Sequence, residues 1–461
     1  MKNSMSLSAA GLITAMVAGC GLAASVATAQ TPPTTRYEFV ALDALGGPWS
    51  NGMAINNRGE VAGLADLPNG AAAAFVYRNG QLELVPGLHP DNTGGAYCIS
   101  EAGEIVGYSY APLVSWPGTV SHAFYWSAET GPVDLEPATD AGSTARAINS
   151  QGQIVGEGGG GSSFGLRMWT VSRGGQVTRS TIPFPGPVGF SREANDIDDA
   201  GSVVGGGWLS TPVWSHAAYI WKGFGTPFTL LPTLGGRDAN AYGVSGDWVV
   251  GRAQPAQGFQ RACLWQAVPG TAPVRYEVLD LGVLDGPYDG GEARSVNRTG
   301  MIVGADQAFG ANGIPPKPWI WVNGAKVALE TLLAPEVREA WTLWWAFDIN
   351  DFGQITGVAV RNPDSQFPDG DTAAFILNPI FDVPVTCSPA DVAGGGGNGD
   401  EPDGIVDGTD FIAFINSFSV GDPAIDSLAD LAGGGPDGFS PDGIIDGNDF
   451  IAFINAFAVG C

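Results

Sequence analysis

The residues best suited to chemistry in this chain are aspartates that recur at fixed spacing near its C-terminus. Asp403, Asp407 and Asp410 occupy the fifth, ninth and twelfth positions of a twelve-residue loop, in which the Ile405 carbonyl is at the seventh position. A second loop, 39 residues later, repeats these types at Asp442, Ile444, Asp446 and Asp449. Calcium takes roughly six to eight oxygen ligands at about 2.3–2.6 Å, and such a loop gathers them from one short stretch. The spacing therefore predicts two Ca²⁺ sites.

The first position of each loop departs from a regular calcium loop, because Gly399 and Gly438 stand where an aspartate is expected. Four residues are candidates for the missing ligand, namely Asp391, Asp430, Asn398 and Asp437. Each of them would reach the metal only if the glycine-rich segment bulges. The alternative is an acidic tail that is solvated and binds no metal.

The segments after the loops are expected to be helices. Apolar residues recur at helical spacing in both copies, at Phe411, Ile412, Phe414, Ile415 and Phe418, and at Phe450, Ile451, Phe453, Ile454 and Phe457. Cys387 and Cys461 bracket the pair and make a plausible disulfide in an exported protein. We therefore predict a small α-helical calcium-loop domain over 391–461, after a linker at 381–390.

This duplicated tail resembles the dockerin module, which uses EF-hand-like loops without the leading helix. The resemblance implies calcium-stabilised attachment to another exported or cell-surface protein. Because the first loop position departs from the pattern, the resemblance does not name that partner.

The rest of the mature chain is built on one repeated phrase. A segment like Ile-Asn-x-x-Gly-x-Val-Val-Gly occurs seven times, and its closing glycines are Gly63, Gly107, Gly156, Gly205, Gly251, Gly304 and Gly357. These glycines lie 44 to 53 residues apart. Each copy is followed by further short, alternating apolar strands, as in AAFVY (73–77) and HAFYW (122–126). This period and grammar are typical of a β-propeller with about four strands per blade.

The two ends of the repeat region predict how the ring closes. YEFVALDALGG (37–47) matches a third-strand phrase but has no strands before it, whereas the seventh repeat lacks that phrase. Pairing the N-terminal strand with the seventh repeat would remove the exposed sheet edges of an open array. We therefore predict a mainly β fold, with a seven-bladed propeller over 36–380. An open β-solenoid is the alternative.

The repeats also resemble the HAF-repeat family of exported bacterial proteins. His122-Ala123-Phe124 spells the family name, His216-Ala217-Ala218 is similar, and the Asn-x-x-Gly phrase is the other hallmark. The resemblance implies a propeller-like extracellular repeat domain and leaves its activity open.

Four acids outside the repeat consensus are candidates for catalysis. These are Glu193, Asp238, Asp289 and Glu292, and each stands just before an expected first strand. Glycosidases use two carboxyl groups roughly 5–10 Å apart, and a propeller channel can supply such a pair. The competing interpretation is that these are solvated loop carboxylates.

Other side chains in the repeats are expected to be structural. The histidines are read as hydrogen-bonding groups within a blade, and Cys98 and Cys263 as buried, unpaired residues. Five tryptophans that end second strands are expected in the core: Trp126, Trp169, Trp221, Trp265 and Trp321. Trp341, Trp344 and Trp345 lie outside that register, where they form either a sugar-stacking platform or local packing.

The composition and the N-terminal residues indicate where the protein is located and which partners are disfavoured. Residues 1–29 read as a signal peptide that ends at Ala27-Thr28-Ala29, although Val17-Ala18-Gly19-Cys20 also resembles a lipobox that would lipidate Cys20. The net charge of −27 disfavours nucleic acid and anionic membrane as partners. No later apolar stretch is long enough to span a bilayer.

These features favour a secreted, non-enzymatic binding or scaffold protein. Its propeller would present a surface for a ligand or glycan, and its tail would attach it to another exported protein. The alternative is an extracellular carbohydrate-active hydrolase that carries a docking tail.

Overall fold

The computed structural model describes the repeat region of the chain, apart from several short segments. The described residues are 36–380, except 43, 116, 160–164, 185–191, 211–213, 272–273, 312 and 363–370, together with Phe414. The predicted signal peptide, the linker, the calcium ligands and the Cys387–Cys461 disulfide lie outside these residues. They therefore stay predictions.

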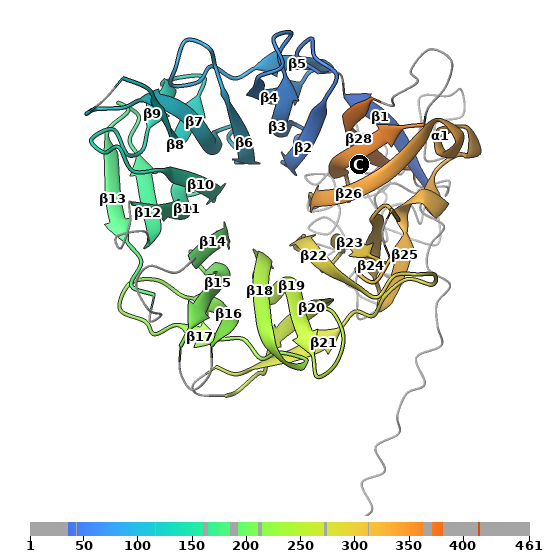
Figure 1. The fold of residues 1–461 in the computed structure, drawn as a ribbon. Coiled ribbons are helices and arrows are strands. Elements are labelled where there is room, and N and C mark those ends of the chain that lie inside the picture. The colour runs from blue at the N-terminus through green and yellow to red at the C-terminus, as the bar shows by residue number, and fades with distance from the viewer. Residues whose placement is uncertain are drawn as a thin grey trace, which may run out of the picture. The chain divides into compact units, whose positions relative to one another are not determined.

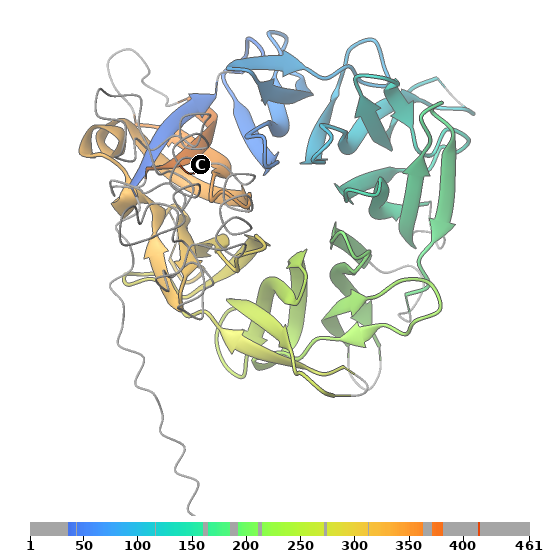
Figure 2. The ribbon, with the colours of Figure 1, turned by 180° about the vertical axis from the view of Figure 1, so that it is seen from behind.

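Residues 36–380 form seven four-stranded antiparallel sheets arranged as blades around a central axis (Figures 1 and 2). Blades 1 to 4 consist of β2 (Ser50–Ile55), β3 (Val61–Asp66), β4 (Ala72–Arg78) and β5 (Gln81–Leu84); β6 (Gly94–Ile99), β7 (Ile105–Pro112), β8 (Thr119–Ser127) and β9 (Gly131–Asp134); β10 (Ser143–Ile148), β11 (Gln153–Gly158), β12 (Gly165–Val171) and β13 (Val177–Thr181); and β14 (Arg192–Ile197), β15 (Val203–Leu209), β16 (Ser215–Trp221) and β17 (Thr229–Leu230). Blades 5 to 7 consist of β18 (Gly235–Ser245), β19 (Trp248–Pro255), β20 (Arg261–Ala267) and β21 (Tyr276–Asp280); β22 (Gly290–Val296), β23 (Ile302–Gln307), β24 (Lys317–Val322) and β25 (Ala325–Ala328); and β26 (Trp341–Ile349), β27 (Ile355–Arg361), β28 (Thr372–Ile380) and β1 (Arg36–Leu42). A 3-10 turn, η2 (Leu329–Leu332), and one short helix, α1 (Pro335–Ala340), connect β25 to β26.

The ring closes as the sequence predicts. The N-terminal strand β1 pairs antiparallel with β28, from Arg36 opposite Ile380 to Leu42 opposite Ala374. It thereby becomes the outer strand of the seventh blade, and the open solenoid is ruled out. Within the described residues β28 is therefore paired on both sides, and the outer edge of β1 makes only an isolated bridge from Tyr37 to Leu333.

Each repeated phrase begins in the innermost strand of its blade, and each of these strands contains a β-bulge at the same repeat position. In blade 3 the register shifts between Ala145 and Ala147, so that Arg146 has no partner on β11. The equivalent shift occurs in the other six blades. A bulge leaves one residue unpaired and re-aims its side chain. The repeated phrase therefore specifies an unpaired inner position in every blade.

The bulge also explains the closing glycines. A Cβ atom on Gly156 would lie 2.1 Å from the Thr144 carbonyl oxygen. At all seven closing glycines the corresponding distance is between 1.9 and 2.1 Å. No side chain fits against a carbonyl at that distance, so these positions require glycine because of close approach.

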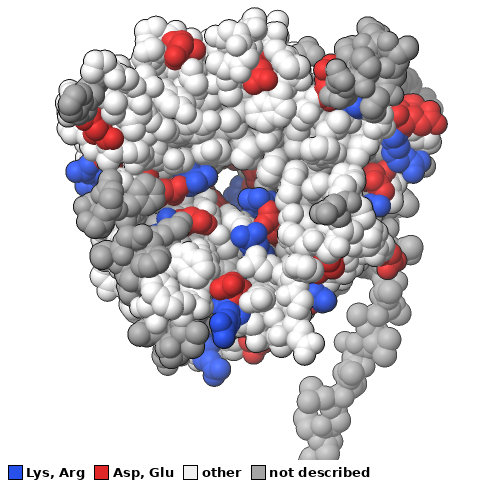
Figure 3. Space-filling model, in the orientation of Figure 1, with Lys and Arg blue, Asp and Glu red and all other residues white. Residues whose placement is uncertain are grey.

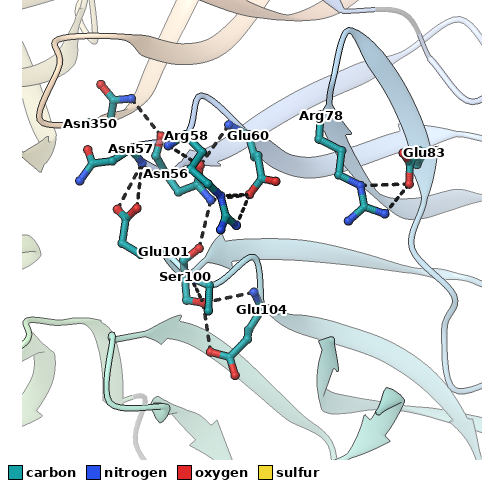
Figure 4. Close-up of polar contacts among 11 residues, drawn as sticks. Asn56, Asn57, Arg58, Glu60, Arg78, Glu83, Ser100, Glu101, Glu104 and Asn350 are labelled. Atoms are coloured by element: carbon teal, nitrogen blue, oxygen red, sulfur yellow. Dashed lines mark hydrogen bonds and ion pairs between the residues drawn. The ribbon is translucent and has the colours of Figure 1, made fainter. Parts of the chain in front are cut away.

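The asparagine of the phrase ties neighbouring blades together (Figure 4). The Asn56 side-chain oxygen accepts the backbone N–H groups of Arg58 and Glu60, which closes the turn. Its Nδ2 donates to the Ser100 carbonyl of blade 2 at 3.1 Å. Asn350 Nδ2 donates in the same way to the Asn56 carbonyl at 2.9 Å, across the junction of blades 7 and 1. The Asn-x-x-Gly element is therefore a turn and an interblade connector.

The core lies between the blades, as expected from the repeated tryptophans, which stand in the third strand of their blades rather than the second. Trp169, Trp221 and Trp265 are fully buried, and Trp126 is 9% exposed. The prediction for Trp321 is wrong, because that residue is only half-buried while Trp319 occupies the blade 6 core. Cys98 and Cys263 are free thiols, and Cys98 is half-buried. No helix in the described part of the chain combines the length and apolar character needed to cross a bilayer.

Candidate functional site in the central channel

The seven unpaired bulge residues form a ring, which we call the collar. Its members are Met53, Tyr97, Arg146, Asn195, Tyr242, Arg294 and Phe347, and every one of them is half-buried. Cation–π contacts join neighbouring members: the Arg294 guanidinium lies 4.7 Å from the Tyr242 ring centroid and 5.7 Å from that of Phe347. The Arg146 guanidinium lies 5.0 Å from the Tyr97 ring in the same manner. The collar therefore contains two arginines, Arg146 and Arg294, each in contact with a neighbouring aromatic ring.

Three arginines and three glutamates lie on and beside the collar. Arg146 pairs with Glu157 at 2.7 Å. Glu292 is buried and pairs with both Arg252, at 3.2 Å, and Arg294. Glu193 accepts a hydrogen bond of 2.6 Å from Asn240 Nδ2. We call the collar and these side chains the collar mouth. The collar members lie in the second half of each innermost strand, and Glu193 and Glu292 lie nearer the strand starts.

The collar mouth has local charge balance, although the whole chain has a net charge of −27. Figure 3 shows acidic and basic side chains gathered together around the hollow at the centre of the ring, on the side of the blades that contain β10, β14, β18 and β22. The blades that contain β2 and β6 border the hollow with mainly uncharged surface in the same view. The arrangement presents fixed donors and acceptors with no net local charge.

Glu157 is a second buried acid of this group, in addition to Glu292. It is 6% exposed, and its Oε2 has no hydrogen-bond partner among the described residues. Burial raises the pKa of the Glu157 carboxyl; Arg146 opposes this shift and Glu193 adds to it. The site thus holds a carboxyl group with unused hydrogen-bonding capacity.

The opposite end of the channel is a cavity of about 650 Å³, lined by the turns of the repeated phrase. Asp196 and Asp348 stand at equivalent positions in its wall. Asp196 Oδ2 accepts the Val244 N–H of blade 5 at 2.8 Å, and Asp348 Oδ2 accepts the Ile55 N–H of blade 1 at 2.9 Å. Burial raises the pKa of Asp196 to about 7 and that of Asp348 to about 6. These two carboxyl groups therefore connect blades, and burial favours their protonated forms.

The rim of this cavity is acidic. Glu101 accepts the Asn57 N–H across the blade 1–blade 2 junction, as Figure 4 shows, and Asp351 pairs with Arg298 at 2.6 Å. Asp198, Asp199 and Asp247 complete the acidic lining. Within the described residues no three His, Cys, Asp or Glu side chains are placed to hold one metal ion.

The four acids proposed from sequence for catalysis do not form a group. Glu193 and Glu292 reach the collar mouth from within β14 and β22 rather than from loops before them. Asp238 accepts the His216 N–H at 2.8 Å. Asp289 accepts the Phe309 and Gly310 N–H groups at 2.7 and 2.8 Å. Asp238 and Asp289 therefore hold loops, and only Glu193 and Glu292 line the channel.

The three tryptophans outside the repeat register separate in the structure. Trp341 packs against Phe39, with ring centroids 5.4 Å apart, so it belongs to blade packing. Trp345 stacks on Phe347 at 5.8 Å and lies beneath Arg294, which places it at the collar mouth. Trp344 is 39% exposed. Local packing is thus confirmed for Trp341 and Trp345, whereas Trp344 is open to solvent.

Of the two histidines at the repeat position, His122 hydrogen-bonds within its blade as expected and His216 does not. His122 is buried, and its Nδ1 lies 2.9 Å from Asp134 Oδ2 within blade 2. Burial lowers the pKa of His122, but the Asp134 hydrogen bond and charge outweigh burial and raise it overall. His216 Nδ1 lies 3.1 Å from the Ala239 carbonyl oxygen and so connects two blades instead of acting within one.

The sequence interpretation missed most of the collar, including Tyr97, Arg146, Tyr242 and Arg294. A signal was present, because each lies directly after a small residue and two positions before the Ile or Val that opens the phrase. If the repeats are aligned from a few residues before the phrase, one position varies in residue type, is often occupied by a large side chain, and mostly lies between small residues.

Comparison with known proteins adds little to this geometry. No family model matches the chain, and neither does any curated protein. Among solved structures, a gluconolactonase from Xanthomonas campestris is 13% identical with a TM-score of 0.36, covering 76% of this chain and 95% of that one. AofleA from Arthrobotrys oligospora is 12% identical with a TM-score of 0.33, covering 64% and 85%. A fungal alcohol oxidase of the AA5 family, in complex with copper, is 12% identical with a TM-score of 0.42, covering 75% and 76%. Similarity this low says nothing about what the present chain binds or does.

Proposed function

We propose that this chain is an exported, non-enzymatic binding protein with two modules. The propeller binds a ligand at the collar mouth. The tail, residues 391–461, binds two Ca²⁺ ions and attaches the propeller to another exported or cell-surface protein.

One observation carries the first half of the proposal: Glu292 and Glu193, the two channel acids that the sequence singled out, are committed to fixed partners. Glu292 is paired with two arginines, and Glu193 accepts from Asn240. Such pairs hold donors and acceptors rigidly in place, as recognition requires. An acid/base pair for hydrolysis needs instead one carboxylate free to attack or to activate water.

The second half rests on the duplicated acidic loops. The ligand set is Asp403, Ile405, Asp407 and Asp410 in the first loop, and Asp442, Ile444, Asp446 and Asp449 in the second, completed by Asp391, Asp430 or Asp437. The tail contains no Lys or Arg to offset its acids. Bound cations would relieve the repulsion between these carboxylates, so metal binding and folding of the tail are coupled.

Calorimetric titration of the full-length protein with Ca²⁺, after treatment with EDTA, tests the tail. We expect two sites, and the double variant Asp403→Asn/Asp442→Asn should weaken both. A titration without heat would contradict the calcium half of the proposal. A Ca²⁺-dependent pull-down from the exported fraction, with the same double variant as control, would then identify the partner.

The alternative function is a carbohydrate-active hydrolase, and one observation favours it. Burial raises the pKa of Glu157 and the neighbouring Glu193 adds to this shift, as is typical of the general acid of a carboxyl pair. Reducing sugar released from a polysaccharide, and lost in Glu157→Gln and in Glu193→Gln, would replace the binding proposal with this one.

A further inference from the structure

Exposed aromatic side chains gather on the face of the ring that contains the collar mouth. The innermost strands start on this face, and the loops between the second and third strands of each blade return to it. Five of the large exposed hydrophobic residues are aromatics on these loops or strand ends: Tyr110 (37% exposed), Trp214 (48%), Phe259 (46%), Phe309 (43%) and Trp344 (39%). They come from blades 2, 4, 5, 6 and 7. We call this set the aromatic rim.

The rim is continuous with the collar in blade 2. The Tyr97 ring of the collar lies 5.6 Å from the Tyr108 ring, which lies 6.5 Å from the exposed Tyr110 ring. A chain of aromatic rings therefore leads from the channel to the outer surface. In blade 7 the exposed Trp344 is adjacent in sequence to Trp345 at the collar mouth.

The rim loops are held in place rather than left to collapse. Asp289 accepts the Phe309 and Gly310 N–H groups, and the Phe309 ring packs 5.2 Å from the Phe259 ring. Contiguous exposed apolar surface marks an interaction site, whereas single exposed apolar residues need no explanation. Phe259 and Phe309 form such a contiguous pair. A scaffold that fixes them there lowers the entropy cost of binding a ligand on them.

The chemistry of the ligand follows from the charges. Arginine only donates hydrogen bonds and carboxylate only accepts them, whereas a hydroxyl group does both. Three arginines balanced by three glutamates give no net local attraction to a charged ligand. The overall charge of −27 repels anionic polymers besides. A polyhydroxylated ligand with no charge matches alternating donors and acceptors, and its apolar C–H faces can cover aromatic rings.

We propose that the collar face binds an uncharged glycan, which stacks on the aromatic rim and hydrogen-bonds to the collar mouth. This inference rests on the proposed binding function and specifies its ligand class and its face.

A polysaccharide microarray probed with the full-length protein at physiological salt tests the inference. The array has uncharged spots of mannan, xyloglucan and β-glucan, anionic polygalacturonate and cationic chitosan. We expect the protein to bind at least one of the uncharged polymers and neither of the two charged ones. Trp344→Ala and Tyr110→Ala should each weaken it about tenfold. The matched control is Phe352→Ala, which removes a 59% exposed aromatic ring from a turn at the opposite end of the channel and should leave binding unchanged. Thermal melts of all three variants confirm that they fold.

The outcomes separate the two proposals. Binding to polygalacturonate or chitosan alone would overturn the uncharged class but leave a binding protein. Equal weakening by Phe352→Ala would overturn the assignment to the collar face. Release of sugars from a bound uncharged polymer would overturn the non-enzymatic function and keep the ligand class. Absence of binding to every spot would overturn both.

Discussion

Replacing a closing glycine by alanine is the sharpest test of how this sequence builds its blades. In Gly156→Ala the new methyl carbon would lie 2.1 Å from the Thr144 carbonyl oxygen. Ordinary carbon–oxygen contacts are about 3.3–3.6 Å, so backbone atoms would have to separate by more than about 1 Å. Overpacking of this kind costs about 1–3 kcal/mol, and each ladder hydrogen bond lost beside the bulge adds about 1 kcal/mol. We therefore expect Gly156→Ala to lower the free energy of unfolding by about 3 kcal/mol or more.

The same blade supplies a matched control. A Cβ atom on Gly142 would meet its nearest neighbour, the Ser121 carbonyl oxygen, at 3.7 Å, which is normal contact. Gly142→Ala should change the free energy of unfolding by less than about 0.5 kcal/mol.

Urea unfolding followed by tryptophan fluorescence measures both variants, since Trp169 is fully buried in this blade. The expected result is a clearly lower midpoint for Gly156→Ala alone. If the two variants had equal midpoints, close approach at the bulge would not be the reason for the repeated glycine.

Three further predictions concern the channel, the interblade connectors and the tail. Burial raises the pKa of Asp196 to about 7 and that of Asp348 to about 6, so the native state retains protons that the unfolded chain releases. The stability that these protonated groups contribute is complete below about pH 4. It is lost as the pH rises through the two native pKa values. The melting temperature should therefore fall from pH 5 to pH 8, less steeply in Asp196→Asn, and thermal melts that show the same slope in both proteins would contradict this. Asn350→Ala removes the hydrogen bond to the Asn56 carbonyl and the turn acceptor for Phe352 and Gln354; urea unfolding should show a loss of about 2–3 kcal/mol, and a loss below about 0.5 kcal/mol would show that the connector is dispensable. In calorimetric scans EDTA should lower only the transition of the tail, and an equal shift of the propeller transition would place the metal elsewhere.

The propeller could be predicted from sequence because its repeats have local physical causes. The asparagine closes a turn, and the glycine leaves room for a carbonyl oxygen. The strand phrase at 37–47 has no strands before it, so it could pair only with the incomplete seventh repeat. Each feature leaves a residue type at a fixed spacing. Blade number and ring closure followed from them.

The site could be predicted only in part, because its residues obey no repeat rule. The collar position is variable: a bulge residue has no partner on the neighbouring strand, so residues as different as Met53 and Arg146 occur there. Glu157 could not be found either, since its importance depends on Arg146 and Glu193 from other strands. Asp238 and Asp289 stood out in sequence for another reason, which is that each caps a loop.

Simultaneous measurement of binding and turnover tests the central claim most directly. The full-length protein is incubated with an uncharged polysaccharide, and retained protein and released reducing ends are determined in the same sample. The account predicts saturable retention that Trp344→Ala weakens, with no reducing ends above those of a protein-free control. Release of sugar that disappears in Glu157→Gln would contradict it and identify the channel as an active site.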